Sequence, residues 1–285
     1  VQGRATRGTE KTPEKLIESS SVDTAPALSP DGRKIAFQSF RSGHPNIWVC
    51  NRDGSDPVQV SKFESHSGTP SWSPDGRRIV FDSVESGNWD LWVVDAEGGI
   101  PQQLTQDPGE DGTPYWSHDG KWIYFHSNRG GSSQIWKLPV EGGQSVQVTR
   151  NGGLYAQESW DGRSLYFSKW HRGSGVWRTS PEGSNEEEEI IPLGESSNWY
   201  DWAVARSGIY FTTFESEGTF EGTFFINGAY TIHYFDFASE KTESIFQRNG
   251  PYFQYFLGVS PDGEWVLFPE AAVGEAELML SENFR

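Results

Sequence analysis

Cysteine, long hydrophobic runs and recognisable catalytic motifs are the features that this sequence lacks. Among its 285 residues Cys50 is the one cysteine, so the chain forms no internal disulfide and has no zinc-type cysteine spacing. No run of about 20 apolar residues occurs, so we expect no membrane insertion by this chain. The sequence has no G-x-S-x-G elbow, H-E-x-x-H, P-loop or G-x-G-x-x-G after a predicted strand, so no motif assigns a catalytic residue.

Basic residues are also in deficit. The chain has 40 acidic and 23 basic side chains, which gives a formal net charge of −17 at pH 7. A surface of this sign repels phosphate backbones, so we expect no direct binding of nucleic acid.

A four-residue phrase, Ser-Pro-Asp-Gly, recurs through the chain. Complete copies occupy 29–32, 73–76 and 260–263, one-residue variants occupy 117–120 and 159–162, and a degraded copy occupies 205–208. Serine, proline and glycine at these positions are typical of a tight turn. An apolar, β-rich run follows each copy, as in Ile79-Val80-Phe81, so each phrase predicts the bend of a hairpin.

The spacing of these turns predicts the fold. Their glycines stand at 32, 76, 120, 162, 208 and 263, so five intervals of 42 to 55 residues separate them. A period of about 40–45 residues with four strand signals in each repeat is typical of a propeller blade. We therefore predict an all-β protein, a six-bladed β-propeller of four-stranded antiparallel blades.

The predicted domain organisation is simple. Residues 1–13 are polar and have no hydrophobic period, so we expect a linker or disordered lead-in. Residues 14–285 form one propeller, with blades at approximately 23–61, 66–106, 111–150, 154–193, 198–247 and 252–285. The last blade lacks its outer strand, and we expect residues 14–18 to supply it and close the ring. We also expect this sequence to be a fragment of a longer protein.

The candidate ligand-binding residues lie before the inner strands or in the loops after the second strands, which share one face of a propeller. They are Asp23, His66, Asp111, Gln157, Glu158, Asp201, Arg41, His44, Arg129 and His171. Carboxylates crowded in one channel raise one another's pKa unless they share a cation, and oxygen ligands suit Ca²⁺. A Ca²⁺ ion in the central channel is one interpretation, and a hydrated acidic pore is the other; no cofactor beyond this is expected.

The repeated phrase also carries a resemblance. Residues 68–83, which contain Gly-Thr-Pro-Ser-Trp-Ser-Pro-Asp-Gly and the strand that follows, resemble the WD40-like repeat of the TolB propeller family. Copies of this repeat extend the resemblance over residues 14–285. Residues 134–143 and 278–285 are similar to the propellers of bacterial winged-helix transcriptional regulators. This second resemblance implies a sensor or interaction domain detached from its DNA-binding half. It also implies a periplasmic location, with a cytoplasmic one as the alternative.

Three function classes follow from these observations. The first is a non-catalytic module that binds a protein segment or a small ligand at the funnel mouth of the ring, within a larger bacterial regulatory protein. The second is a propeller enzyme, such as a lactonase, lyase or glycan-active hydrolase with a channel metal. The third is a structural scaffold domain.

Overall fold

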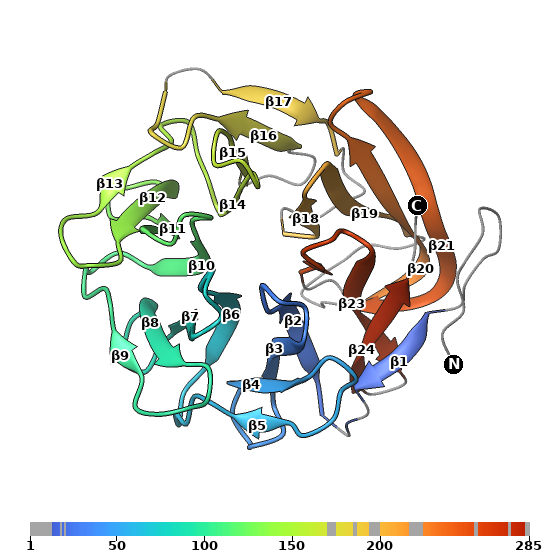
Figure 1. The fold of residues 1–285 in the computed structure, drawn as a ribbon, viewed down its shortest axis with the longest axis horizontal. Helices are drawn as coiled ribbons and strands as arrows, with labels where there is room; N and C mark the ends of the chain where they lie inside the picture. Colours follow the sequence, from blue (N-terminus) through green and yellow to red (C-terminus); the bar gives the residue numbers. More distant parts are fainter. Residues whose placement is uncertain are drawn as a thin grey trace.

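The computed structural model describes the chain except at a few segments. The described residues are 13–17, 19, 21–169, 175–184, 187–193, 200–216, 225–253, 256–272 and 275–282. None of them lies in a helix, and so none belongs to a helix that could cross a membrane. Figure 1 shows the strands arranged as a ring of sheets around a central axis.

The repeated phrase forms the turn that the sequence predicts. In the second copy the amide of Gly76 donates to the carbonyl of Ser73 at 2.8 Å, and the Ser73 hydroxyl donates to Asp75 at 2.6 Å. The same hydroxyl accepts from the amide of Arg78 at 2.9 Å and so fixes the start of the next strand. Gly76 has a φ of +70°, a conformation that favours glycine.

Four of the sheets are regular blades of four antiparallel strands, ordered from the axis outward. The first holds β2 (Asp23–Leu28), β3 (Lys34–Ser39), β4 (Asn46–Asn51) and β5 (Val58–Gln59). The second holds β6 (Ser67–Trp72), β7 (Arg78–Ser83), β8 (Asp90–Asp95) and β9 (Gln102–Gln103). The third holds β10 (Asp111–Trp116), β11 (Trp122–Ser127), β12 (Gln134–Pro139) and β13 (Val146–Gln147). The fourth holds β14 (Tyr155–Glu158), β15 (Leu165–Ser168), β16 (Val176–Thr179) and β17 (Glu188–Ile191).

The prediction of six blades is wrong, because the structure has five. The fifth and sixth repeats share one eight-stranded sheet. It contains β18 (Trp202–Ala205), β19 (Gly208–Ser216), β20 (Phe225–Asp236), β21 (Lys241–Phe253), β22 (Gly258–Val259), β23 (Trp265–Ala272) and β24 (Glu275–Glu282), with β1 (Glu14–Ile17).

The physical reason for the merger is strand length. Strands β20 and β21 are 12 and 13 residues long, whereas β4 and β5 in the first blade are 6 and 2 residues long. The far end of β21 therefore reaches β23, where Tyr252 pairs with Glu270. This one residue pair joins the two repeats into one sheet.

Closure of the ring by the leading strand is confirmed. Strand β1 pairs antiparallel with β24, with Glu14 opposite Leu280 and Ile17 opposite Leu278 (Figure 1). Ile17 is 3% exposed and packs in a cluster with Ile35 and Leu267. The leading strand thus holds the last repeat against the first blade.

The core lies between neighbouring blades. The second strand of each regular blade carries a fully buried phenylalanine at the same repeat position: Phe37, Phe81, Phe125 and Phe167. Clusters of apolar side chains from adjacent blades join these rings into a continuous wall. This packing fixes the inner strands that surround the axis.

Candidate functional site

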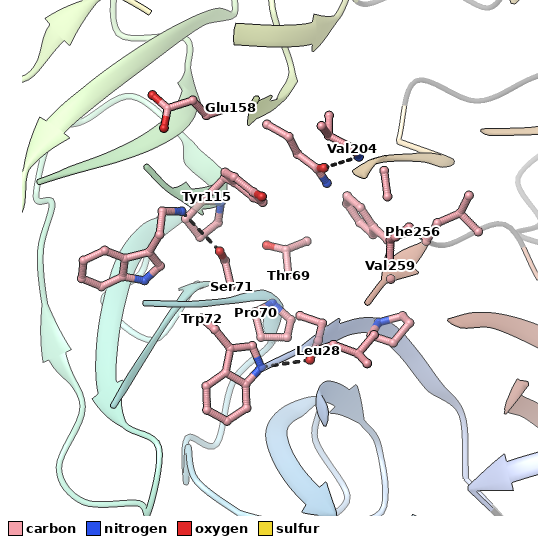
Figure 2. A pocket seen from close by; sticks show the side chains of 18 of the residues that line it. Leu28, Thr69, Pro70, Ser71, Trp72, Tyr115, Glu158, Val204, Phe256 and Val259 are labelled. Atoms are coloured by element: carbon pink, nitrogen blue, oxygen red, sulfur yellow. Dashed lines mark hydrogen bonds between the residues drawn. The ribbon is translucent and has the colours of Figure 1, made fainter. Parts of the chain in front are cut away.

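A cavity of about 400 Å³ lies among the inner strands at the axis of the ring. Its walls come from β2, β6, β10, β14, β18 and β22, together with the turns that follow several of these strands. Figure 2 shows this wall, with Thr69, Tyr115, Val204, Phe256 and Val259 arranged around the open space. The cavity size is that of a site for a small ligand or a short peptide.

A repeated backbone feature shapes the wall. Ala25, Thr69, Thr113 and Phe256 each stand four residues before the turn serine, and each has a positive φ between 44° and 57°. In β2, β6 and β10 the pairing register shifts at this position, as in a β-bulge. The bulge re-aims the side chains that follow it, so all four residues line the cavity.

Hydrogen bonds between blades hold these bulges in place. The Asp82 carboxylate accepts from the Thr69 hydroxyl at 2.5 Å and from the Thr113 amide at 2.8 Å. The Thr113 hydroxyl in turn donates to the carbonyl of Leu154 at 2.6 Å in the next blade. Since three blades contribute to this chain of bonds, the wall is rigid before any ligand arrives.

Most polar groups on the wall are already engaged. The Ser71 hydroxyl accepts from the Trp116 amide at 3.3 Å, and the Gln157 carbonyl oxygen accepts from the Val204 amide at 2.7 Å. Figure 2 shows both of these contacts, and it shows the hydroxyl end of Tyr115 pointing toward the open space. Burial and the nearby Glu158 charge raise the pKa of Tyr115 to about 12, so its hydroxyl is a neutral donor.

Glu158 lies on the wall with its carboxylate turned toward the neighbouring blade. One oxygen accepts from the Tyr124 hydroxyl at 2.8 Å, and the other accepts from the amide of His118 at 2.6 Å. Glu158 is 8% exposed. With both oxygens bonded across the blade boundary, the carboxylate acts as a structural acceptor at this position.

Four of the predicted site residues form two ion pairs at equivalent places in the first and third blades. Asp23 accepts from Arg41 at 2.6 Å, and Asp111 accepts from Arg129 at 2.6 Å. Both carboxylates have no exposed surface, and burial raises the pKa of each above its ordinary value, against the lowering effect of serine and arginine partners. The pairs flank the cavity without lining it.

Aromatic rings enclose these arginines. The Arg41 guanidinium lies 5.1 Å from the Trp48 ring centroid, and that of Arg129 lies 5.2 Å from Trp136. In the fourth blade Lys169 takes the corresponding place, 3.4 Å from Trp177 and paired with Glu187 at 2.9 Å. Each cation thus ties the second and third strands of its blade together.

The other predicted site residues do not form a single cluster. Gln157 and Glu158 are on the cavity wall. His66 is half-buried, with its Nε2 3.2 Å from the amide nitrogen of Gln38, while His44 is exposed in the loop after β3. Asp201 is buried beside β18. His171 lies outside the described residues.

The described residues do not gather the carboxylates as the channel-cation interpretation requires. Within the described ranges, no three His, Cys, Asp or Glu side chains lie close enough together to hold a metal ion. Of the four predicted carboxylates, Glu158 alone lies on the described wall of the cavity, and it is bonded to Tyr124 and His118.

Several residues of the wall were not among the predicted site residues. Thr69, Thr113, Tyr115, Phe256 and His118 line the cavity from the middle and the turn end of the inner strands. The signal was present in the repeat, because the residue two positions before each turn serine faces the axis. The left-handed backbone at Thr69, Thr113 and Phe256 concealed it, since none of these residues is a glycine that would signal such a conformation.

Comparison with known proteins finds proteins that are similar to this chain in sequence or in fold. Over 42 residues the chain is 45% identical to the Tol-Pal system protein TolB of Bordetella pertussis, a match covering 15% of this chain and 10% of that protein. The crystal structure of TolB from Acinetobacter baumannii aligns with a TM-score of 0.67 at 22% identity, covering 86% of this chain and 58% of that one. The chain thus matches about a tenth of the curated relative and just over half of the TolB structure.

A second protein of similar fold is named for an enzymatic activity. A gluconolactonase from Xanthomonas campestris aligns with a TM-score of 0.67 at 13% identity, covering 94% of this chain and 88% of that one. At this identity the likeness shows the fold alone. The family model described as the TolB beta propeller domain matches residues 8–213. Because that match extends over well more than half of the sequence, the chain belongs to the TolB beta propeller domain family.

Proposed function

We propose that this chain is a non-catalytic binding propeller that takes a short, extended segment of a partner protein into its axial cavity. The observation that carries the proposal is the wall itself. Its polar groups at Ser71, Gln157 and Glu158 are engaged in bonds between blades, so the shape is formed in advance. A preformed, largely apolar cavity with a few directed polar groups is typical of a binding site.

An extended segment fits the shape of the site. Four consecutive residues of each of the inner strands β2, β6 and β10 line the cavity, which corresponds to about 13 Å of wall at about 3.3 Å per residue. A peptide in extended conformation has a similar rise and needs donors and acceptors at intervals along it. The Tyr115 hydroxyl, which Figure 2 shows facing the open space, is one such donor.

The family relation supports the same reading. The relative that shares 45% identity over 42 residues is named as a protein of the Tol-Pal system, which suggests work within a multi-protein assembly. On this relation we also propose that the chain is the interaction domain of a larger bacterial regulatory protein in the periplasm, with the cytoplasm as the alternative. The link to winged-helix regulators stays a prediction.

The alternative is a propeller enzyme, and the gluconolactonase is the relative that raises it. Against it stands the state of Glu158, whose two oxygens are bonded to Tyr124 and to the His118 amide and so are not placed to move a proton. Hydrolysis of gluconolactone by the purified chain, abolished by a wall substitution, would favour this alternative.

Affinity selection from a mixture of random eight-residue synthetic peptides tests the proposal. The expected result is enrichment of a related set of sequences by the purified chain, identified by mass spectrometry. Two outcomes would contradict it: no enrichment over a heat-denatured control, or enrichment that an excess of selected peptide does not displace.

A further inference from the structure

The second position of the repeated turn divides the ring into two parts. Proline occupies it in three repeats, at Pro30, Pro74 and Pro261. In the three consecutive repeats between them the occupants are His118, Trp160 and Arg206. The three residues that replace proline are therefore neighbours around the ring, at the end of the cavity where the turns lie. His118 and Trp160 help to line the cavity there.

Trp160 contacts each of the other two side chains. The ring centroids of His118 and Trp160 lie 5.0 Å apart, and the Arg206 guanidinium lies 4.9 Å from the Trp160 ring centroid. His118 and Arg206 are exposed, while Trp160 between them is half-buried. A guanidinium stacked on an aromatic face keeps its plane fixed, so its N–H groups stay available at the edge.

The charge of the Arg206 turn also differs from that of other turns of the repeat. Asp31 in the first turn lies 4.0 Å from Arg33, and Asp161 in the Trp160 turn lies 3.9 Å from Arg163. In the turn of Arg206 the aspartate is replaced by Ser207. Among the ion pairs between described residues none includes Arg206, so this turn adds a positive charge to an acidic protein.

We propose that His118, Trp160 and Arg206 form a carboxylate-recognition site at the turn-side mouth of the cavity. Its ligand is a carboxylate of the bound segment, either an acidic side chain or a C-terminal group. Arg206 donates a paired hydrogen bond from its fixed plane, and His118 supplies a second donor beside it. This inference rests on the proposed function, because it names the chemistry of one end of the segment.

Affinity selection with two random eight-residue mixtures tests the site, one with free and one with amidated C termini. We expect wild type to enrich peptides with an Asp or Glu near one end, or free acids over amides. We expect Arg206→Met to lose this preference and to bind a selected peptide about fivefold more weakly, as for an exposed ion pair. Arg206→Lys should recover only part of the affinity, because lysine lacks the planar fork.

Arg163→Met is the matched control, since Arg163 is an exposed arginine on the same face beside Asp161. It should leave affinity and acid preference unchanged. Enrichment without any acid preference, or equal losses in the two arginine variants, would overturn the carboxylate site while leaving the proposed function standing. Absence of any enrichment would overturn both. Whether Glu→Gln or C-terminal amidation of the selected peptide weakens binding identifies the source of the carboxylate.

Discussion

The Glu158 carboxylate of β14 accepts a 2.8 Å hydrogen bond from the Tyr124 hydroxyl of β11, across the boundary between two blades. Its other oxygen accepts from the His118 amide at 2.6 Å. Glu158→Ala would leave the buried Tyr124 hydroxyl and the partly buried His118 amide without this acceptor, so it should lower the free energy of unfolding by about 1–3 kcal/mol. Urea unfolding followed by tryptophan fluorescence measures this. Glu158→Gln, which retains an acceptor, should cost less; equal losses would contradict the bridging role.

Closure of the ring predicts a second effect on stability. Ile17 of β1 is 3% exposed and packs with Ile35 and Leu267, so Ile17→Ala should destabilise the fold by about 2–5 kcal/mol. Deletion of residues 1–20 removes the whole closing strand, so it should lower the melting temperature by more than Ile17→Ala does. Glu14→Ala, an exposed change on the same strand, is the control. A chain lacking 1–20 that melts at the wild-type temperature would rule out this closure.

The buried ion pairs predict non-additive mutations. Asp111 has no exposed surface and holds Arg129 at 2.6 Å, so Asp111→Ala leaves a largely buried guanidinium with only the more distant Asp107 carboxylate, at 3.9 Å, and should cost about 3 kcal/mol. Arg129→Met together with Asp111→Ala should cost less than the sum of the single changes. A double-mutant cycle in urea measures the coupling, and additive losses would show that the pair does not interact.

The turn aspartates predict a pH dependence. Hydrogen bonds from the turn serines, followed by backbone amides, hold the pKa of Asp31, Asp75 and Asp161 below the ordinary value of 3.8. A pKa that is lower in the folded state stabilises the fold above pH 3.8, and this contribution is lost as the pH falls through the folded value. The triple Asp→Asn variant should therefore melt a few degrees below wild type at pH 7.

The difference in melting temperature between the triple variant and wild type should shrink as the pH is lowered below 3.8. Asp95→Asn, at an exposed position at the end of β8, serves as the control. It should have the melting temperature of wild type at pH 7 and also below pH 3.8. A gap that stays constant down to about pH 2 would show that the turn carboxylates do not supply the stabilisation.

Much of the architecture could be predicted from the sequence, because it depends on local chemistry. The Ser-Pro-Asp-Gly phrase forms its turn through bonds within five residues, such as those of Ser73 to Asp75 and Arg78. The closing strand could be predicted by counting the strands of each repeat, since the last repeat lacked an outer strand. The blade count did not, because the merger depends on one long-range pair, Tyr252 with Glu270, that repeat spacing does not encode.

The candidate site was harder to predict for a similar reason. Gln157 and Glu158 were predicted as ligand-binding residues in the segment that enters an inner strand, whereas the structure has both within β14, on the cavity wall. Thr69 and Thr113 were missed because their left-handed backbone is stabilised by Asp82, a residue of another strand, and neither is a glycine that would signal the conformation. A side chain's face after such a bulge depends on contacts between blades.

The binding of a selected eight-residue peptide to Ala27→Phe tests the central claim most directly. Ala27 is half-buried on the cavity wall, so a phenyl ring there would fill the space that the segment needs. Val58→Phe, which enlarges an exposed side chain on the outer strand β5, is the matched control. We predict that Ala27→Phe keeps the wild-type melting profile and weakens the peptide at least tenfold by fluorescence anisotropy, whereas Val58→Phe binds as wild type does. Unchanged affinity in a folded Ala27→Phe protein would contradict binding in the axial cavity.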